Sequence, residues 1–256
     1  MSVVTTPAVL LRSFPYSETS RVLRFYTESL GIVGVMAKGV RRSGSKSGGG
    51  LDTFTGGALT LYVKSTRDLQ TLRDFSPTRA RRGLASDVHR FAAAAVLAEL
   101  VLRHAGEESN PELFRALEGG LDRVEAAEAG RVPGVLLAEA WRTVAVLGYR
   151  PEVHACVACG SAVGDAMARF DFAQGGVRCA PCAATAPAVG PRLGPGARAQ
   201  LASLCDGVVP PDLDRPRAHL RLLSDFITYH VSGTRPLQAF AVLSALLPPG
   251  DDEADA

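Results

Sequence analysis

Two pairs of cysteines constrain this chain more than any other feature of its sequence. Cys156 and Cys159 form one Cys-x-x-Cys pair, and Cys179 and Cys182 form a second pair after 19 intervening residues. Two thiolates on one tight turn present two corners of a tetrahedron, and a second such turn supplies the other two. The spacing therefore predicts one structural Zn²⁺ held by four cysteines. Because the segment is too short to have its own core, metal binding would drive its folding.

Other uses of these cysteines agree less well with the sequence. Disulfides are rare in cytoplasmic proteins, and a redox Cys-x-x-Cys site needs only one pair. Zinc deaminases combine Pro-Cys-x-x-Cys with His-x-Glu, whereas His154 is followed by Ala155 and Cys156. Four cysteines also leave no open coordination position for water. We therefore expect a metal that braces the fold, and no motif in the chain indicates an enzyme.

The first 80 residues have the pattern of a small β-barrel. In the segment GALTLYVKS, Leu59, Leu61 and Val63 alternate with Tyr62 and other polar residues, which is typical of a half-buried strand. Strands are expected in five segments: 8–14, 20–27, 31–39, 57–65 and 69–75. Five short strands with Gly-rich and Ser-rich turns favour a barrel of the OB type. An SH3-like barrel has a similar length and strand count, so the pattern alone does not choose between them.

From residue 86 onward, the apolar residues follow a helical period. Helices are expected in six segments: 86–106, 110–130, 133–149, 195–205, 215–233 and 235–247. Ser86 and Asn110 are the expected N-caps of the first two helices, and Pro111 suits the first helical position. The fold class is therefore α+β and multidomain, with a barrel followed by a helical bundle that contains the zinc insert. The expected parts are a barrel (1–82), the first half of a helical domain (83–150), a zinc finger (151–190), the second half of the helical domain (191–247) and a disordered acidic tail (248–256).

Charge is distributed unevenly along the chain. Residues 1–85 contain 13 Lys and Arg against 5 Asp and Glu, a net charge of +8, and the remaining residues carry −6. The segment AKGVRRSGSKSGGG, residues 37–50, has four cations, no acid and five glycines. A pliable cationic loop contributes little to a core, but it exposes backbone N–H groups and charge to a polyanion. The front of the chain is therefore expected to bind a polyanion.

Three stretches together resemble the RecO family of bacterial recombination mediators. They are VLLRSFPYSETSRVLRFYTESLGIVGVMAKGVRR at residues 9–42, the two cysteine pairs inserted among helices, and YHVSGTRPLQA at residues 229–239. Their order and spacing carry the resemblance, which spans most of residues 8–240. Many members have Lys-Ser after the last Pro-Leu, where this chain has Gln238 and Ala239. A contact made by that segment in the family can therefore differ here.

The resemblance implies an N-terminal OB fold, a helical domain and an embedded zinc finger. It also implies binding to single-stranded DNA (ssDNA) and double-stranded DNA (dsDNA), and annealing of complementary strands. The implied partners are RecR, often RecF, the C-terminal tail of the single-strand-binding protein (SSB), and indirectly RecA, which is loaded onto SSB-coated DNA. Trp141 and Arg142 are one candidate site for the SSB tail, which would need an apolar pocket edged by arginine.

We expect DNA to contact the basic face of the barrel without reading its sequence. Cations there would bind phosphates, and Tyr62 could stack on a base. The predicted contacts are Lys38, Arg41, Arg42, Lys46, Tyr62, Lys64, Arg67, Arg73, Arg79, Arg81 and Arg82. Phe25 and Phe54 are expected in the core instead.

The main rival hypothesis is an RNA-binding protein that combines an OB fold with a zinc ribbon, because its barrel, loop and metal would look the same. The sequence contains no run of 18 apolar residues, so no membrane span is expected, and the N-terminal segment MSVVTTPAVLLRSF lacks the features of a secretory signal. We therefore expect a cytoplasmic, nucleoid-associated protein without a membrane partner.

Overall fold

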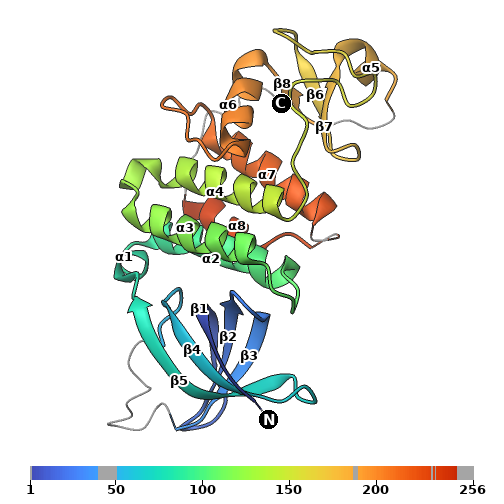
Figure 1. Cartoon of the computed structure of the whole chain (residues 1–256). Coiled ribbons are helices and arrows are strands. Elements are labelled where there is room, and N and C mark those ends of the chain that lie inside the picture. The colour runs from blue at the N-terminus through green and yellow to red at the C-terminus, as the bar shows by residue number, and fades with distance from the viewer. Residues whose placement is uncertain (1, 40–50, 187–189, 232, 234, 247–256) are drawn as a thin grey trace. The chain divides into compact units, whose positions relative to one another are not determined.

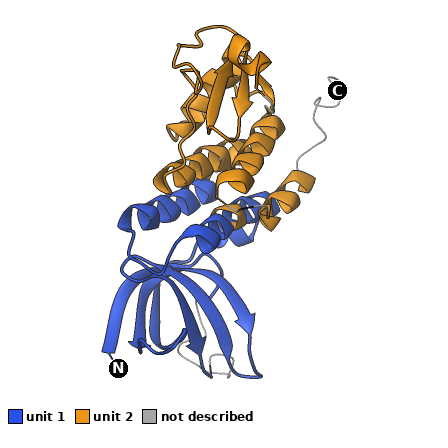
Figure 2. Cartoon of the chain, turned by 90° about the vertical axis from the view of Figure 1, so that its right-hand side faces the viewer, with its two compact units in different colours: residues 1–94, 98–126 blue, residues 95–97, 127–256 orange. Residues whose placement is uncertain are grey.

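The structure is a computed structural model that describes residues 2–39, 51–186, 190–231, 233 and 235–246 (Figure 1). Contacts between residues divide the chain into two compact units (Figure 2). Unit 1 contains residues 1–94 and 98–126, and unit 2 contains residues 95–97 and 127–256. Within the described ranges, no helix is long and apolar enough to cross a membrane. The division into five parts expected from the sequence stays a prediction.

Unit 1 begins with a closed barrel of five strands. They are β1 (Ser2–Pro15), β2 (Arg21–Thr27), β3 (Gly31–Ala37), β4 (Gly56–Val63) and β5 (Leu69–Arg79). The strand order around the barrel is β1-β2-β3-β5-β4, and β4 closes it by pairing with β1. β3 and β5 pair in parallel, whereas the other neighbours are antiparallel. This five-stranded arrangement is OB-like, which confirms the expected barrel.

Alternating apolar residues fill the barrel, as the sequence pattern predicts. Leu59 and Leu61 are fully buried, and Val63 packs against the same core. The rings of Phe25 and Phe75 lie 5.2 Å apart inside this core. Phe25 and Phe54 are both buried, in agreement with the expectation that they serve packing and not DNA binding.

Three helices of unit 1 follow the barrel: α1 (Arg82–Ala85), α2 (Val88–His104, of which 95–97 belong to unit 2) and α3 (Pro111–Ala126). The Asn110 Oδ1 accepts a hydrogen bond of 3.0 Å from the Leu113 N–H, so the expected cap of α3 is confirmed. The expected cap at Ser86 is wrong. Asp87 caps α2 instead, since its carboxylate accepts a 2.8 Å bond from the Arg90 N–H, and Ser86 ends the short helix α1.

Unit 2 contains the remaining helices and a small sheet. Its elements are η1 (Ala129–Arg131), α4 (Val132–Val146), β6 (Ala168–Asp171), β7 (Gly176–Cys179), α5 (Ala180–Ala184), β8 (Arg192–Leu193), α6 (Pro195–Cys205), α7 (Pro216–His230) and α8 (Gln238–Leu246). Its sheet has the order β7-β6-β8. Trp141 of α4 packs against Phe226 of α7 with ring centroids 5.1 Å apart, and Phe170 of β6 contacts the same Phe226. One aromatic cluster therefore joins the small sheet to the helices of unit 2.

Candidate metal centre and nucleic-acid interface

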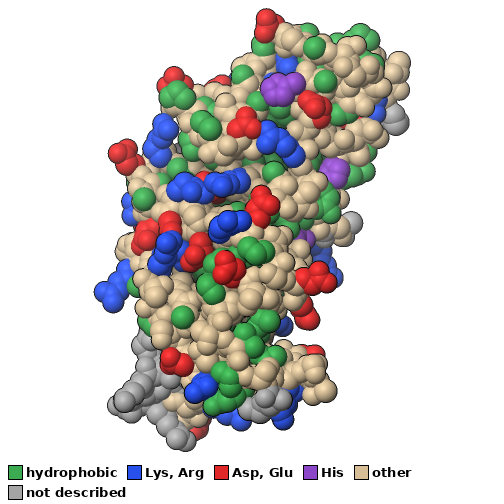
Figure 3. Space-filling model, viewed as in Figure 1, with side chains coloured by type: hydrophobic (Ala, Val, Ile, Leu, Met, Phe, Trp, Pro, Cys, Tyr) green, Lys and Arg blue, Asp and Glu red, His purple; other side chains and the backbone are tan. Residues whose placement is uncertain are grey.

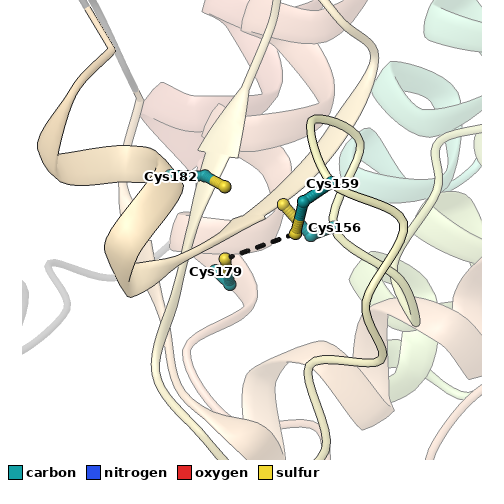
Figure 4. A group of neighbouring side chains, drawn as sticks. All are labelled: Cys156, Cys159, Cys179 and Cys182. Atoms are coloured by element: carbon teal, nitrogen blue, oxygen red, sulfur yellow. Dashed lines mark hydrogen bonds between the residues drawn. The ribbon is translucent and has the colours of Figure 1, made fainter.

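The four cysteines of the two Cys-x-x-Cys pairs converge on one point of unit 2 (Figure 4). All four Sγ atoms lie within 4.8 Å of one another, and the Sγ atoms of Cys159 and Cys179 are 3.9 Å apart. A tetrahedral zinc site with Zn–S bonds of about 2.3 Å has sulfur–sulfur edges of about 3.8 Å. The cluster is therefore the right size for one metal ion, and the predicted ligand set is confirmed as a spatial group.

Two local turns hold the first pair. The Gly160 N–H donates to the Cys156 carbonyl (2.8 Å), and the Cys156 N–H donates to the Ser161 carbonyl (2.8 Å). Gly160 has φ of 74°, a left-handed conformation that glycine adopts without a steric cost. Upstream, the Glu152 carboxylate accepts hydrogen bonds from the N–H groups of His154 and Ala155. These bonds fix the backbone that leads into the first two ligands.

The second pair comes from a hairpin followed by a helical turn. Cys179 ends β7 and is also the N-cap of α5, which places Cys182 one turn later on the same side. β6 and β7 form the expected hairpin. Gly175 lies in its turn with φ of 69°, whereas Gly176, also expected in the turn, already belongs to β7 and pairs with Asp171. An ion pair between Arg178 and Asp171 joins the two strands.

The sulfurs compete for protons, as expected when four thiols share a small volume. Burial tends to raise the pKa of Cys156, but backbone N–H donors of Cys179, Cys159 and Ala158 outweigh it and lower this pKa to about 6. Side-chain hydrogen bonds with Cys179 and Cys159 raise the pKa of Cys182 to about 12. One thiol thus ionises readily while another resists because of its neighbours. A divalent cation would stabilise all four as thiolates.

On the barrel, the predicted DNA contacts have different surroundings. Lys38 is exposed just beyond β3, Lys64 and Arg67 lie in the β4–β5 loop, and the Arg73 guanidinium lies 5.7 Å from the centroid of the Tyr62 ring. Arg82 is exposed at the start of α1. Arg41, Arg42 and Lys46 lie outside the described residues. No observation places DNA against these side chains, so the contacts stay predictions.

Arg81 is the exception, because the prediction that it contacts DNA is wrong. Its side chain is only 1% exposed, and it donates to the Asp122 carboxylate (2.6 Å), to Glu118 and to the Phe54 carbonyl (2.9 Å). Arg79 also pairs with Asp122 but remains half exposed. Two of the three basic residues at the end of the barrel therefore bind acids of α3. In the face drawn in Figure 3, basic and acidic side chains are likewise interspersed over the helices.

A cationic and aromatic group on β1 and β2 is absent from the contacts predicted from the sequence. The Arg12 guanidinium lies 5.6 Å from the centroid of the exposed Phe14 ring, and Tyr16 at the β1–β2 turn is 68% exposed. Arg24, which pairs with Arg12 in the strand register, is also exposed. In OB folds, the face of strands 2 and 3 and the loops β1–β2 and β4–β5 bind oligonucleotides. The β1–β2 segment LLRSFPYSE contains both a cation and aromatic residues, so this general property of OB folds could have identified it from the sequence.

Gly34 explains how this group continues across the barrel. A Cβ atom added to Gly34 of β3 would lie 3.3 Å from a guanidinium nitrogen of Arg24 and 2.8 Å from the Leu69 side chain. The Arg24 side chain therefore crosses β3 towards the start of β5, beside the loop that carries Lys64 and Arg67. We give the name barrel face to six exposed residues and one half-buried residue: Arg12, Phe14, Tyr16, Arg24, Lys38 and Arg67 are exposed, and Lys64 is half-buried.

Trp141 cannot form an exposed partner pocket. It is fully buried in the aromatic cluster of unit 2, so the candidate site for an acidic tail at Trp141 and Arg142 is wrong. Helical spacing predicts that Trp141 lies on the apolar face of its helix. Only the structure shows that Phe226 packs against it and leaves no room for a ligand.

Comparisons with known proteins cover nearly all of the chain. Residues 1–81 match the family model described as Recombination protein O N terminal, and residues 85–237 match Recombination protein O C terminal. The chain is 33% identical over 239 residues to DNA repair protein RecO of Anaeromyxobacter sp. (strain K), covering 90% of this chain and 92% of the relative. It is also 33% identical to DNA repair protein RecO of Rubrobacter xylanophilus over 205 residues, which covers 80% and 81% of the two chains. The comparisons do not favour the RNA-binding alternative.

Proposed function

The chain belongs to the RecO family, and on that premise we propose that it is a recombination mediator in DNA repair that binds ssDNA and dsDNA through the barrel face. It would anneal complementary strands and, with RecR and RecF, promote loading of RecA onto SSB-coated DNA. An acidic SSB tail is a further proposed partner, at a site other than Trp141. The protein would act in the cytoplasm, in association with the nucleoid.

One observation carries this proposal: the Arg24 side chain lies across β3 at Gly34. It thereby connects the Arg12–Phe14 pair of β1 with the β4–β5 loop that carries Lys64 and Arg67. Guanidinium groups bind phosphates of any sequence, and exposed aromatic rings stack on any base. A surface of this kind can hold a strand without selecting its sequence, which is what annealing of arbitrary complementary strands requires.

We assign the metal a structural role. The donor set of four cysteines is the one typical of structural zinc sites, and it completes a tetrahedron without an open position for a reacting water. Zn²⁺ would lock the knuckle after Glu152 to the β6–β7 hairpin. Arg198 of α6 donates to the carbonyls of Gly164 and Ala166, so the braced segment is also tied to the helices of unit 2.

The test is DNA binding by the full-length protein, measured by fluorescence anisotropy at several salt concentrations. Phe14→Ala should weaken ssDNA binding about fivefold to a hundredfold, because stacking contributes about 1–3 kcal/mol per base. Arg24→Ala should reduce the logarithmic salt slope on ssDNA by about 0.7, the value for one phosphate. Arg115→Ala, an exposed cation of α3 in the same unit, is the matched control. Unchanged affinity and slope in both barrel variants would refute the barrel face.

The cationic segment of residues 37–50 has its own arm in this experiment. Replacing Arg41, Arg42 and Lys46 together by alanine should reduce the ssDNA salt slope by up to about 2, or about 0.7 for each phosphate contact. Annealing of complementary oligonucleotides coated with SSB should fall in parallel in the variant of this segment and in the barrel-face variants. Loss of annealing without loss of DNA binding would instead indicate a partner contact.

A further inference from the structure

Unit 2 contains a pocket that the proposed DNA interface does not use. It has a volume of about 830 Å³ and lies between the β8–α6 segment and α7. Pockets of about 300–1,000 Å³ that combine an apolar lining with a few polar groups are typical of small-molecule sites. Here Met167, Leu193 and Leu222 supply apolar surface, and Met167 is 47% exposed. Its thioether is a favourable contact for an aromatic ring.

The N-terminus of α6 presents unpaired donors to this pocket. Gly194, Gly196 and Ala197 line it, α6 has no side-chain cap, and its first turn carries no acid. The first amides of a helix have no acceptor within the helix. Among the described residues, nothing accepts from the N–H groups of Gly196 and Ala197. Such N–H groups and the helix dipole favour an anion.

Two arginines add positive charge at the same place. Arg192 of β8 and Arg215, the N-cap of α7, both line the pocket, and neither forms an ion pair within the described part of the chain. Arg215 keeps a left-handed backbone with φ of 45°, which is unusual for a residue with a side chain. Asp214 is the acidic residue of the lining, so the two arginines leave the pocket positively charged.

A buried imidazole completes the lining and is independent of the helix ends. His219 is only 5% exposed, and its Nε2 faces the Gln200 Oε1 at 3.3 Å. Gln200 Nε2 donates to the Asp212 carbonyl (2.7 Å), which leaves Oε1 to accept from the His219 Nε2–H. Nδ1 is then the atom without a partner in the described structure. Nδ1 is itself buried, so the imidazole supplies a wall of the pocket and not a hydrogen-bonding atom for the ligand.

We propose that this pocket binds a nucleoside 5′-monophosphate group, with the phosphate at the α6 N-terminus between Arg192 and Arg215 and the base against Met167 and Leu222. A phosphate monoester carries a charge near −2 at neutral pH, which two guanidinium groups and helix amides match better than they match a single carboxylate. The aromatic base accounts for the apolar half of the lining. The source is either a free nucleotide or the 5′-phosphorylated end of a DNA strand.

The first arm uses isothermal titration calorimetry of the full-length protein with adenosine 5′-monophosphate, and adenosine as the phosphate-free control. The nucleotide should bind at least about tenfold more tightly than adenosine, because charge-assisted hydrogen bonds to the phosphate are lost in the latter. Arg215→Gly should remove most of this difference. Since glycine accepts the left-handed backbone at 215 without strain, this variant should remain folded. Arg192→Ala is the second pocket variant.

The matched control is Arg221→Ala, which removes an exposed cation from the same helix at a position outside the lining. It should leave nucleotide binding unchanged. Arg24→Ala of the barrel face should also leave it unchanged, so failure of the DNA proposal and failure of this one can be told apart. Equal binding of nucleotide and adenosine, or unchanged nucleotide affinity in both Arg215→Gly and Arg192→Ala, would overturn the assignment.

The second arm separates the two sources. If the site takes DNA ends, a 5′-phosphorylated oligonucleotide should bind more tightly than its 5′-hydroxyl form, and Arg215→Gly should abolish the difference. If the site takes free nucleotides, both oligonucleotides should bind alike. A peptide with the sequence of residues 250–256, GDDEADA, tests carboxylates as the alternative anion. Tighter binding of this peptide than of adenosine 5′-monophosphate would also overturn the proposal.

Discussion

Arg81 offers the sharpest test of how unit 1 is held together. Its guanidinium joins the end of the barrel to α3 through Asp122 and Glu118, and it also satisfies the Phe54 carbonyl. Arg81→Ala removes all of these bonds at once. Breaking a fully buried ion pair costs about 3–5 kcal/mol. Because the Asp122 and Glu118 side chains are 38% and 24% exposed, water can partly replace the lost donors, and the expected cost is about 3 kcal/mol.

The backbone at position 81 provides an internal control. Its φ of 44° costs a non-glycine residue about 1 kcal/mol, a cost that glycine avoids. Arg81→Gly should therefore unfold at a higher urea concentration than Arg81→Ala, with a difference of about 1 kcal/mol in the free energy of unfolding. If Ala and Gly destabilise equally, the left-handed conformation is not the strain inferred here.

The assay is urea unfolding followed by far-UV circular dichroism, together with DNA binding of the folded variants. A loss of about 3 kcal/mol lowers the urea midpoint by about 1–2 M when the slope is near 2 kcal/mol per M. Arg82→Ala removes the neighbouring exposed cation and should leave the midpoint unchanged. The DNA salt slope should be the same in Arg81→Ala as in the parent protein. A reduced slope with an unchanged midpoint would refute the assignment of Arg81 to structure.

Three further predictions concern the metal, the pH dependence and a backbone contact. Cys159→Ser should lower bound zinc from about one ion per chain to none, measured by elemental analysis; full zinc occupancy in the variant would contradict the four-cysteine site. Burial lowers the pKa of His219 from its usual 6.5, so the unfolded state takes up a proton first and stability should fall as pH drops below about 6.5. His219→Gln should reduce this loss of stability, measured by urea titrations at pH 7 and 5.5. Part of the loss should remain, because burial and the charge of Arg103 also lower the pKa of His104. Gly31→Ala should cost about 2 kcal/mol or more, since φ is 62° and the new Cβ would lie 2.4 Å from the Gly106 carbonyl oxygen; an unchanged urea midpoint would contradict that close approach.

Features set by neighbours in the sequence could be predicted. The Cys-x-x-Cys spacing is local, the alternation of Leu59 and Leu61 is local, and the Asn110 cap acts three residues ahead, so each is found where expected. The N-cap of α2 was predicted one residue too early, at Ser86. Ser86 and Asp87 are both good N-caps, and the choice depends on the short helix α1, which ends at Ser86 and was not anticipated.

Features set by distant partners could not be predicted. Arg81 and Arg82 are equivalent in the sequence, yet the acids that bury Arg81 come from positions 37 and 41 residues later. The role of Trp141 depends on Phe226, which is 85 positions away in the chain. The crossing of Arg24 at Gly34 likewise depends on strand register, which a list of strand segments does not contain.

The charge asymmetry shows how far such distant pairing changes a functional argument. The division at residue 85 suggests a module of +8, but the acids of α3 belong to the same compact unit as the barrel. Unit 1 as a whole contains 17 Lys and Arg against 13 Asp and Glu, a net charge of +4, and unit 2 carries −2. Arg79 and Arg81 are among the cations that these acids compensate. Affinity for DNA must therefore come from cations that have a phosphate within reach, and not from the net charge of the module. The salt slope on ssDNA should then fall by about 0.7 for each cation removed from the barrel face or from the segment of residues 37–50, and removal of Arg81 should leave it unchanged.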